Sequence, residues 1–147
     1  MSTSSDQLAR LFPVTFRSVI RLLAVELDKQ DQGVRLPVFG VLDFLLTNSQ
    51  AVQTDLANHF AKDKSVMLHQ LDEMEKAGLI ERQMDPNDRR RKNLVVTKAG
   101  IAAHRKVDRI RAMVFSNALA GVSEKELATC LKVLNRMNDN ANSGDVQ

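Results

Sequence analysis

Apolar residues recur at helical spacing over most of the chain, so the sequence predicts a mainly α-helical fold. The first such run predicts an amphipathic helix from about Asp6 to Lys29. Pro13 lies within it, and because proline removes a backbone donor, we expect a kink or a fresh start there. Gly33 is expected to end the segment. The apolar positions of this helix are Leu8, Leu11, Phe12, Phe16, Val19, Ile20, Leu23 and Leu27.

The next segments predict a core helix followed by a helix-turn-helix. The helix near Pro37–Thr47 is apolar on nearly every side, which places it in the core. Two short helices follow, at Thr54–Phe60 and from Asp63 to about Ala77, with a tight turn around Ala61–Lys62. We expect Asp63 to cap the second helix and Gly78 to close it. Its predicted inward face consists of Met67, Leu71 and Met74.

Beyond Gly78 the pattern predicts a β-hairpin with a cationic tip. Leu79–Gln83 and Asn93–Thr97 are typical of short strands, and the segment between them, Asp85–Lys92, combines turn-forming residues with four cations. A hairpin directly after a helix-turn-helix predicts the wing of a winged helix. Four like charges repel one another unless they meet an anion, and duplex DNA is the polyanion that fits this shape. The alternative is a solvated basic loop, since charge runs often indicate exposure alone.

Two further helices are predicted after the hairpin. One runs from Thr97 to about Ala120 and stops at Gly121. Ser123 and Glu126 have the spacing of a capping box for the other. Its apolar stripe consists of Leu127, Cys130, Leu131, Leu134 and Met137.

These elements predict a winged helix-turn-helix with flanking dimerisation helices. We divide the chain into an N-terminal dimerisation helix (1–35), the DNA-binding domain (36–97), C-terminal dimerisation helices (98–139) and a disordered tail (140–147). The outer helices carry apolar faces larger than a small DNA-reading domain needs, and such faces usually meet a partner. In a symmetric dimer they pair across a two-fold axis. The alternative is that they fold back onto their own core.

Charge and composition narrow the function. The 147 residues carry a net charge of +3, and six cations against two acids lie between Arg82 and Lys98. Such local concentration favours a nucleic-acid partner. One cysteine excludes an intrachain disulfide, and the three histidines show no metal-ligand spacing. We expect no cofactor, and no phosphate loop or nucleophile motif indicates an enzyme. Neither a signal peptide nor a membrane span is evident, which predicts a soluble, cytoplasmic protein.

Several short motifs resemble the MarR family of bacterial transcription regulators. They are Leu71-Asp72, Glu75–Arg82, Asp88-Arg89-Arg90 and Thr97–Gly100, and they occur in the family's order and spacing. The resemblance covers roughly residues 36–100, and the flanking helices by pattern only. It implies a homodimer with a winged helix-turn-helix in each subunit. Such proteins bind pseudo-palindromic operators, usually as repressors that small molecules or oxidants release.

The resemblance assigns roles to the wing residues. By position, Arg90 matches the arginine that enters the minor groove, where negative potential is concentrated. Asp88 matches the acid that structures the wing by pairing with a nearby arginine. Arg89, Arg91 and Lys92 are then expected to contact the DNA backbone.

The predicted recognition helix departs from the family pattern. Val66, Leu68 and His69 stand where small hydroxyl residues and an arginine are common, and Glu73 replaces a basic residue. Val66 and Leu68 could touch thymine methyls, and His69 could donate to a base or phosphate. The alternative is a partly buried Leu68 and a plain surface His69. Lys64, Ser65 and Gln70 are further DNA-binding candidates, although Gln70 could face the core.

The resemblance also implies an effector site between the dimerisation helices and the winged helix. An anionic aromatic ligand needs a cation beside apolar walls. The candidates are Phe16, Arg17, Phe39, His104 and Arg105, each of which could equally be core or surface. Family members that sense oxidants carry their reactive cysteine near the N-terminus. We therefore interpret Cys130, in the last helix, as a buried structural thiol rather than a sensor.

The sequence thus favours a dimeric DNA-binding regulator that acts as a repressor, with activation left open because it depends on operator position. The alternative is a winged-helix module for protein–protein assembly, whose basic wing meets an acidic partner. Removal of Arg90 and the salt dependence of DNA binding distinguish the two.

Overall fold

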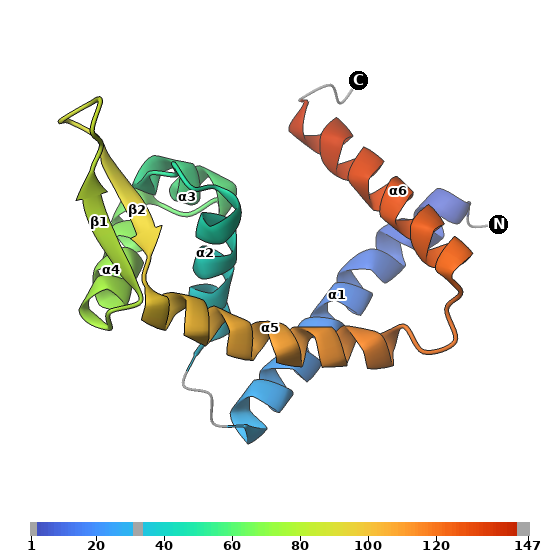
Figure 1. The fold of residues 1–147 in the computed structure, drawn as a ribbon. Coiled ribbons are helices and arrows are strands. Elements are labelled where there is room, and N and C mark those ends of the chain that lie inside the picture. Colours follow the sequence, from blue (N-terminus) through green and yellow to red (C-terminus); the bar gives the residue numbers. More distant parts are fainter. Residues whose placement is uncertain (1–2, 31–33, 144–147) are drawn as a thin grey trace. The chain divides into compact units, whose positions relative to one another are not determined.

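The computed structural model describes residues 3–30 and 34–143 and confirms a mainly α-helical chain with one small β-hairpin (Figure 1). The elements are α1 (Ser4–Lys29), α2 (Leu36–Thr47), α3 (Gln53–His59), α4 (Lys64–Lys76), β1 (Ile80–Met84), β2 (Lys92–Val96), α5 (Lys98–Ala118) and α6 (Glu124–Asn142). They form two compact units, one ending at Val114 and the other beginning at Phe115. The predicted helix end at Gly33 and the last four tail residues lie outside the described residues.

Helix α1 is continuous, so the predicted fresh start at Pro13 is wrong. Proline leaves the carbonyl of Ala9 without its helical donor. Both residues are exposed, so water can satisfy that carbonyl and the helix loses little. The helix begins with a capping box in which the Asp6 backbone N–H donates to Thr3 Oγ1 at 3.2 Å and the Thr3 N–H donates to Asp6 Oδ2 at 3.1 Å.

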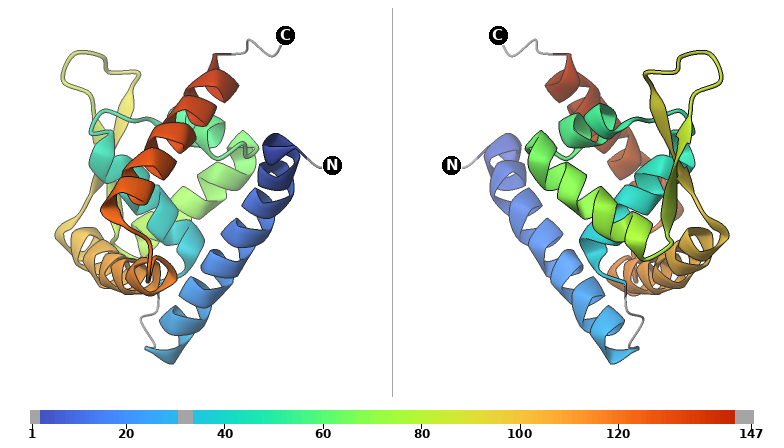
Figure 2. Two further views of the ribbon diagram at one scale, coloured as in Figure 1. Left: turned by 90° about the vertical axis from the view of Figure 1, so that its right-hand side faces the viewer. Right: turned by 90° about the vertical axis from the view of Figure 1, so that its left-hand side faces the viewer.

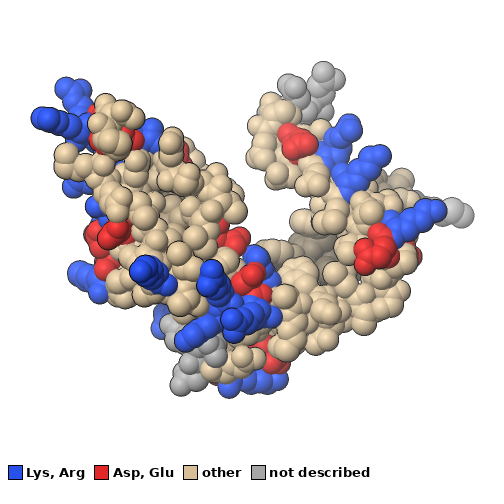
Figure 3. Space-filling model, in the orientation of Figure 1, with Lys and Arg blue, Asp and Glu red and all other residues tan. Residues whose placement is uncertain are grey.

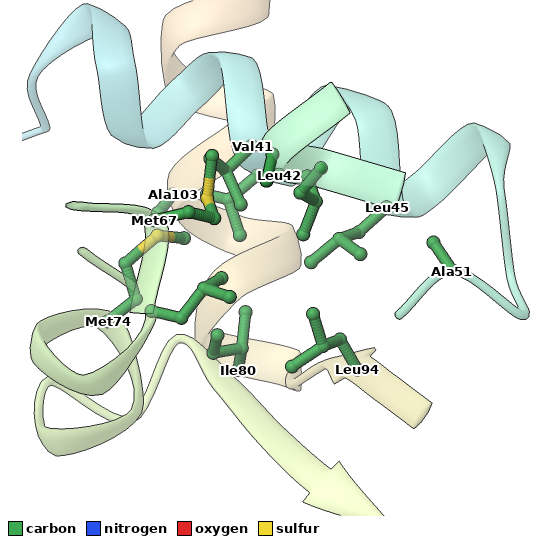
Figure 4. Close-up of a cluster of buried hydrophobic side chains, with 12 residues drawn as sticks. Val41, Leu42, Leu45, Ala51, Met67, Met74, Ile80, Leu94 and Ala103 are labelled. Atoms are coloured by element: carbon green, nitrogen blue, oxygen red, sulfur yellow. The ribbon is translucent and has the colours of Figure 1, made fainter. Parts of the chain in front are cut away.

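The first hydrophobic core forms where α2 meets the helix-turn-helix and the hairpin (Figure 4). Met67, Leu71 and Met74 of α4 are buried in it, as their spacing predicted. Ile80 and Leu94 bring in the two strands, so the hairpin and α4 share one closely packed core. The remaining members are Val41, Leu42, Leu45, Ala51, Leu56, Ala57 and Ala103.

A second core joins α1 to the first part of α5. Phe39 of α2 is buried in it together with residues from both helices. The winged helix is therefore packed onto α1 and α5 within one unit. The other members are Leu23, Leu27, Val107, Ile110 and Val114.

Two turns position α4. Ala61, between α3 and α4, has a left-handed φ of 48°, which accounts for the tight turn. Gly78 follows α4 with φ 73°, the conformation that a helix-ending glycine adopts most easily. Asp63 is the residue at the N-cap position of α4, but its side chain makes no capping hydrogen bond, so that part of the prediction is wrong. Its carboxylate is consequently still available to repel or attract a partner.

The start of α5 is fixed to the end of α4. The Thr97 hydroxyl donates to the carbonyl of Gly78 at 2.6 Å and accepts from the backbone N–H of Gly100 at 3.0 Å. A side chain at Gly100 would place its Cβ 2.1 Å from the carbonyl oxygen of Leu79. Only glycine allows α5 to approach the hairpin this closely.

Helix α6 buries none of its residues in the single chain. The predicted capping box is confirmed, with the Glu126 N–H donating to Ser123 Oγ at 3.3 Å. Cys130 is exposed, so its predicted burial is not found in one copy of the chain. The helix extends to Asn142, so the prediction of disorder is wrong for residues 140–142. The Asn142 side chain donates to Asn138 Oδ1 at 3.3 Å and supports this last turn. Within the described ranges, no helix is both long and apolar enough to cross a membrane.

Candidate nucleic-acid interface

The exposed face of α4 carries most of the predicted base-reading residues. Lys64 and Ser65 are exposed at its start. Val66 and Leu68 keep 52% and 42% of their surface, so both are accessible to a partner, and the alternative of a partly buried Leu68 stays open. His69 is exposed and lies 3.4 Å from the Glu73 carboxylate one turn later. This face can therefore present one cation and two apolar side chains to a groove.

Gln70 is engaged within the protein rather than directed outward. Its Oε1 accepts from Lys62 Nζ at 3.0 Å, and its Nε2 donates to the carbonyl of Pro37 at 3.0 Å. These bonds tie α4 to the turn before it and to the start of α2. Gln70 therefore has a structural role, in line with the reservation that it could face the core, and its contact with DNA stays a prediction.

The hairpin is a regular antiparallel pair with a compact tip. Ile80 pairs with Val96 at the base and Met84 with Lys92 at the end. The tip lies beyond α2 and α3 (Figures 1 and 2), and Lys and Arg side chains gather on it (Figure 3). Arg89 and Arg90 are exposed, and neither guanidinium has an acidic partner among the described residues. These two cations are consequently free to bind an anion.

The acid that organises the wing is Asp85. Its Oδ1 accepts the backbone N–H groups of Asn87 at 2.8 Å and Asp88 at 3.2 Å, and its Oδ2 accepts from the Asn93 side chain at 3.0 Å. These bonds, the one from Asn87 above all, hold the pKa of Asp85 below its ordinary value. Asp85 therefore remains an anion inside a cationic loop because the loop's own donors surround it.

Asp88 shapes the wing differently from the prediction. Its Oδ1 accepts the backbone N–H of Arg90 at 2.9 Å, and its carbonyl accepts the N–H of Arg91 at 2.9 Å. The expected ion pair with an arginine is not among the interactions of the described residues. The pairing acid is instead Asp85, whose Oδ2 lies 3.9 Å from Arg91 Nε. The role of Asp85 could have been predicted from the sequence. Asp85 precedes the only proline of the hairpin, and an aspartate at such a position often accepts a hydrogen bond from the backbone two residues later.

Arg91 is held by protein groups and not simply displayed. One terminal nitrogen of its guanidinium donates to the carbonyl of Gln50, between α2 and α3, at 2.5 Å. Its Nε donates to Asn93 Oδ1 at 3.2 Å. The guanidinium of Arg91, which was predicted to contact the DNA backbone, thus already donates to two protein acceptors. Lys92 begins β2 and is exposed.

Arg82 joins the first strand of the wing to α4. It donates to Asp72 Oδ1 at 2.6 Å and also to the Glu75 carboxylate. Its backbone N–H donates to Glu75 Oε1 at 3.1 Å. The interface thus has one exposed helix face and one exposed cationic tip, joined by ion pairs and by a common core.

The predicted effector residues are brought together only in part. Phe39 and His104 stack with ring centroids 4.9 Å apart. His104 Nε2 also lies 2.7 Å from Asp43, which had not been predicted. Arg111, likewise missed, lies 5.0 Å from the centre of the Phe39 ring and 3.4 Å from Asp43. Phe16, Arg17 and Arg105 are exposed.

A family model places this site among known proteins. The description "MarR family" matches residues 36–92, which contain α2, the helix-turn-helix and most of the hairpin. This stretch of the chain is therefore similar to the MarR family. A protein of Thauera aromatica, described as a candidate transcriptional regulatory protein for the hcr operon, is 28% identical over 106 residues. The match covers 72% of this chain but only 64% of that relative's length.

Solved structures share the fold of this chain. Transcriptional regulator PA3341 is 25% identical with a TM-score of 0.74, and the match covers 92% of this chain and 98% of PA3341. A structure of MarR itself has a TM-score of 0.78 at 23% identity, covering 97% and 96% of the two chains. MepR of S. aureus, in a complex with DNA, has a TM-score of 0.73 at 21% identity, covering 95% and 96%. At these last two identities the likeness shows the fold alone.

Proposed function

We propose that the chain is a sequence-specific DNA-binding transcriptional regulator that acts as a homodimeric repressor on a pseudo-palindromic operator. The observation that supports this best is the pairing of an exposed α4 face with a tip whose Arg89 and Arg90 have no acidic partner among the described residues. A rigid core under both keeps them at a fixed spacing. The complex of the structural relative MepR with DNA is consistent with this use of the fold.

In the proposed complex α4 lies in the major groove. Val66 and Leu68 are the exposed apolar side chains that can contact thymine methyl groups. Lys64, Ser65 and His69 supply donors to phosphates or base edges. Arg90 enters the adjacent minor groove, and Arg89 and Lys92 bind phosphates beside it. Each phosphate contact adds salt dependence without sequence preference.

The exposed apolar side chains of the outer helices support the proposed homodimer. On α1, Leu11 and Phe16 keep 63% and 61% of their surface, and on α6 Leu131 keeps 53%. Side chains of this kind on successive turns favour burial against a second copy. Two copies related by a two-fold axis would read half-sites about one helical turn apart.

An effector that alters the separation of the two reading heads would release DNA, because both must dock together. Phe39, His104 and Arg111 lie between the winged helix and the helices that flank it, which makes them our revised candidates for contact with a small aromatic or anionic ligand. CouR from Rhodococcus jostii RHA1, a structural relative, was solved with p-coumaroyl-CoA. Screening by thermal shift followed by DNA release tests this step.

The decisive experiment selects duplexes from a random pool and titrates them by fluorescence anisotropy at two salt concentrations. The proposal expects an enriched palindrome that the wild type binds with strong salt dependence. Arg90→Ala should weaken this binding by roughly 1–3 kcal/mol. Equal, weak binding by both proteins with no enrichment would refute it. Attention would then turn to an acidic protein partner for the wing.

A further inference from the structure

The tip end of the wing is anchored to a part of the chain that is distant in sequence. Arg91 Nη2 donates to the carbonyl of Gln50, 41 positions earlier and just before α3. A second tie runs alongside it, because the backbone N–H of Leu94 donates to the carbonyl of Ala51 at 3.3 Å. The loop that leads into the helix-turn-helix therefore meets the second strand of the wing at two points.

The anchor is continuous with the network that shapes the tip. Asn93 accepts from Arg91 Nε through Oδ1 and donates to Asp85 Oδ2 through Nδ2 at 3.0 Å. Asp85 in turn accepts the backbone N–H groups of Asn87 and Asp88, and its side chain keeps 17% of its surface. A chain of hydrogen bonds thus runs from the Gln50 carbonyl through three side chains to the turn that carries Arg90.

The three neighbouring arginines differ in their environment although their sequence is uniform. Arg89 and Arg90 make no side-chain hydrogen bond or ion pair within the described part of the chain, whereas the Arg91 guanidinium donates to two acceptors and faces a carboxylate. Exchanging these partners for a phosphate gains Arg91 less than an arginine without protein acceptors gains by binding one. Because the Gln50 acceptor is a backbone carbonyl, it is present whatever the side chain.

We propose that Arg91 is a positioning residue that fixes the wing against the loop before α3, and thereby aims Arg90, rather than a contact to DNA. This inference rests on the proposed function, since it presupposes that the wing binds DNA. A wing that pivots freely pays an ordering cost on binding, and the anchor removes that cost in advance. Asp85 and Asn93 belong to the same device.

A double-mutant cycle tests the coupling. In the wild type, Arg90→Ala should weaken binding to the selected operator roughly 5- to 150-fold. In an Arg91→Ala background the same change should cost less than about threefold, because Arg90 is no longer aimed. An independent phosphate contact would instead give additive losses. Arg89→Ala is the matched control, since the Arg89 side chain is exposed and makes no contact with the anchor among the described residues, and its loss should add to that of Arg90.

Salt dependence separates the two roles further. Removing a phosphate contact lowers the slope of log affinity against log salt by about 1. Arg91→Ala should therefore weaken binding with the slope unchanged, while Arg89→Ala lowers the slope. A drop in slope of about 1 for Arg91→Ala would overturn the proposal.

A substitution of Asp85 tests the anchor while every cation stays in place, because the two explanations predict opposite changes in DNA affinity. Removing an acid from a DNA-binding surface should tighten binding if charge alone matters. Asp85→Ala should instead weaken it, because the tip loses its organising acceptor. Glu81→Ala is the matched control. Glu81 is an exposed residue of β1, and its substitution removes the same charge without touching the anchor. Urea unfolding of each variant verifies that the fold is retained.

The outcomes keep the two proposals apart. If the wild type selects no operator, the DNA-binding function itself fails. If the wild type binds and Arg90→Ala weakens binding, but the cycle is additive and Asp85→Ala tightens binding, only the positioning role of Arg91 is wrong.

Discussion

The guanidinium of Arg82 on β1 donates to Asp72 of α4 at 2.6 Å and also holds Glu75 one turn later. The Arg82 side chain keeps 19% of its surface, so the contact is partly shielded from water. Two carboxylates on one guanidinium make the ion pairs between the reading helix and the wing depend on a single cation. Both carboxylates lie on the side of α4 that turns toward the hairpin rather than away from it.

Arg82→Ala should lower the free energy of unfolding by roughly 1–3 kcal/mol, because charge-assisted hydrogen bonds are lost and two neighbouring acids are left unpaired. Urea unfolding followed by circular dichroism measures the change. Adding Asp72→Asn and Glu75→Gln in the same chain should recover part of the loss. Arg89→Ala, which is exposed, should stay within about 0.5 kcal/mol of the wild type.

Gly100→Ala should destabilise the fold by roughly 1–3 kcal/mol or more, as overpacking does. The new Cβ would lie 2.1 Å from the backbone oxygen of Leu79, and a backbone atom cannot swing aside as a flexible side chain can. Thermal unfolding tests this prediction. The reverse change at Ala99→Gly, one residue earlier on the exposed side of α5, serves as a comparison in which only the helix propensity falls.

The hairpin and the helix-turn-helix were predictable because their signals are local. Gly78 stops one helix, the alternation changes after it, and four cations occupy the turn. The buried face of α4 followed from the spacing of Met67, Leu71 and Met74 alone. These features depend on neighbours within a few positions, which a sequence displays directly.

The hydrogen bonds of Gln70 and Arg91 could not be predicted, because their partners lie far away in the chain. Gln70 bonds the carbonyl of Pro37, and Arg91 bonds that of Gln50. Backbone carbonyls leave no mark in the residue type, so no pattern could have shown that these side chains are occupied. The contact between Asp43 and Arg111 was missed because 68 positions separate the two residues. The fresh start predicted at Pro13 was wrong for a different reason. A proline on the exposed side of a helix destabilises the helix less than the rule assumes.

Gln70→Ala should affect stability and leave operator preference unchanged. It removes two hydrogen bonds, at about 1 kcal/mol for a typical bond, so unfolding should shift measurably. Leu68→Ala should do the opposite, because its side chain is 42% exposed and contributes little to the core. Repeating operator selection with both variants checks this. A changed consensus for Gln70→Ala would return it to the base-reading set.

The capping box at the start of α6 predicts a pH dependence. The Ser123 hydroxyl first, and then its backbone N–H, hold the pKa of Glu126 below its ordinary value of 4.5. A depressed carboxyl pKa means that the box stabilises α6 fully above pH 4.5 and loses this contribution as the pH falls through the lowered value. Carbon-13 NMR titration of the Glu126 carboxyl should give a midpoint below 4.5. Ser123→Ala should raise the midpoint toward the ordinary value.

The exposed apolar side chains of α1 and α6 predict that the chain self-associates. Leu131 of α6 is 53% exposed and Leu11 of α1 is 63% exposed, and α6 buries no residue at all in the single chain. A stripe such as this gains free energy only by meeting another surface, at about 25 cal/mol per Å² of apolar area covered. Leu131→Glu and Leu11→Glu should each shift the chain from dimer to monomer in sedimentation velocity.

Val66→Glu is the matched control for these assembly variants. Val66 is 52% exposed but lies on the reading face of α4, so the same polar change should leave the oligomeric state untouched. The dimer also predicts a difference in binding. Leu131→Glu should weaken binding to the full operator but affect binding to an isolated half-site little, because only the full operator binds both DNA-binding units of a dimer at once. A Leu131→Glu protein that remains dimeric would instead direct the α6 stripe to a different partner.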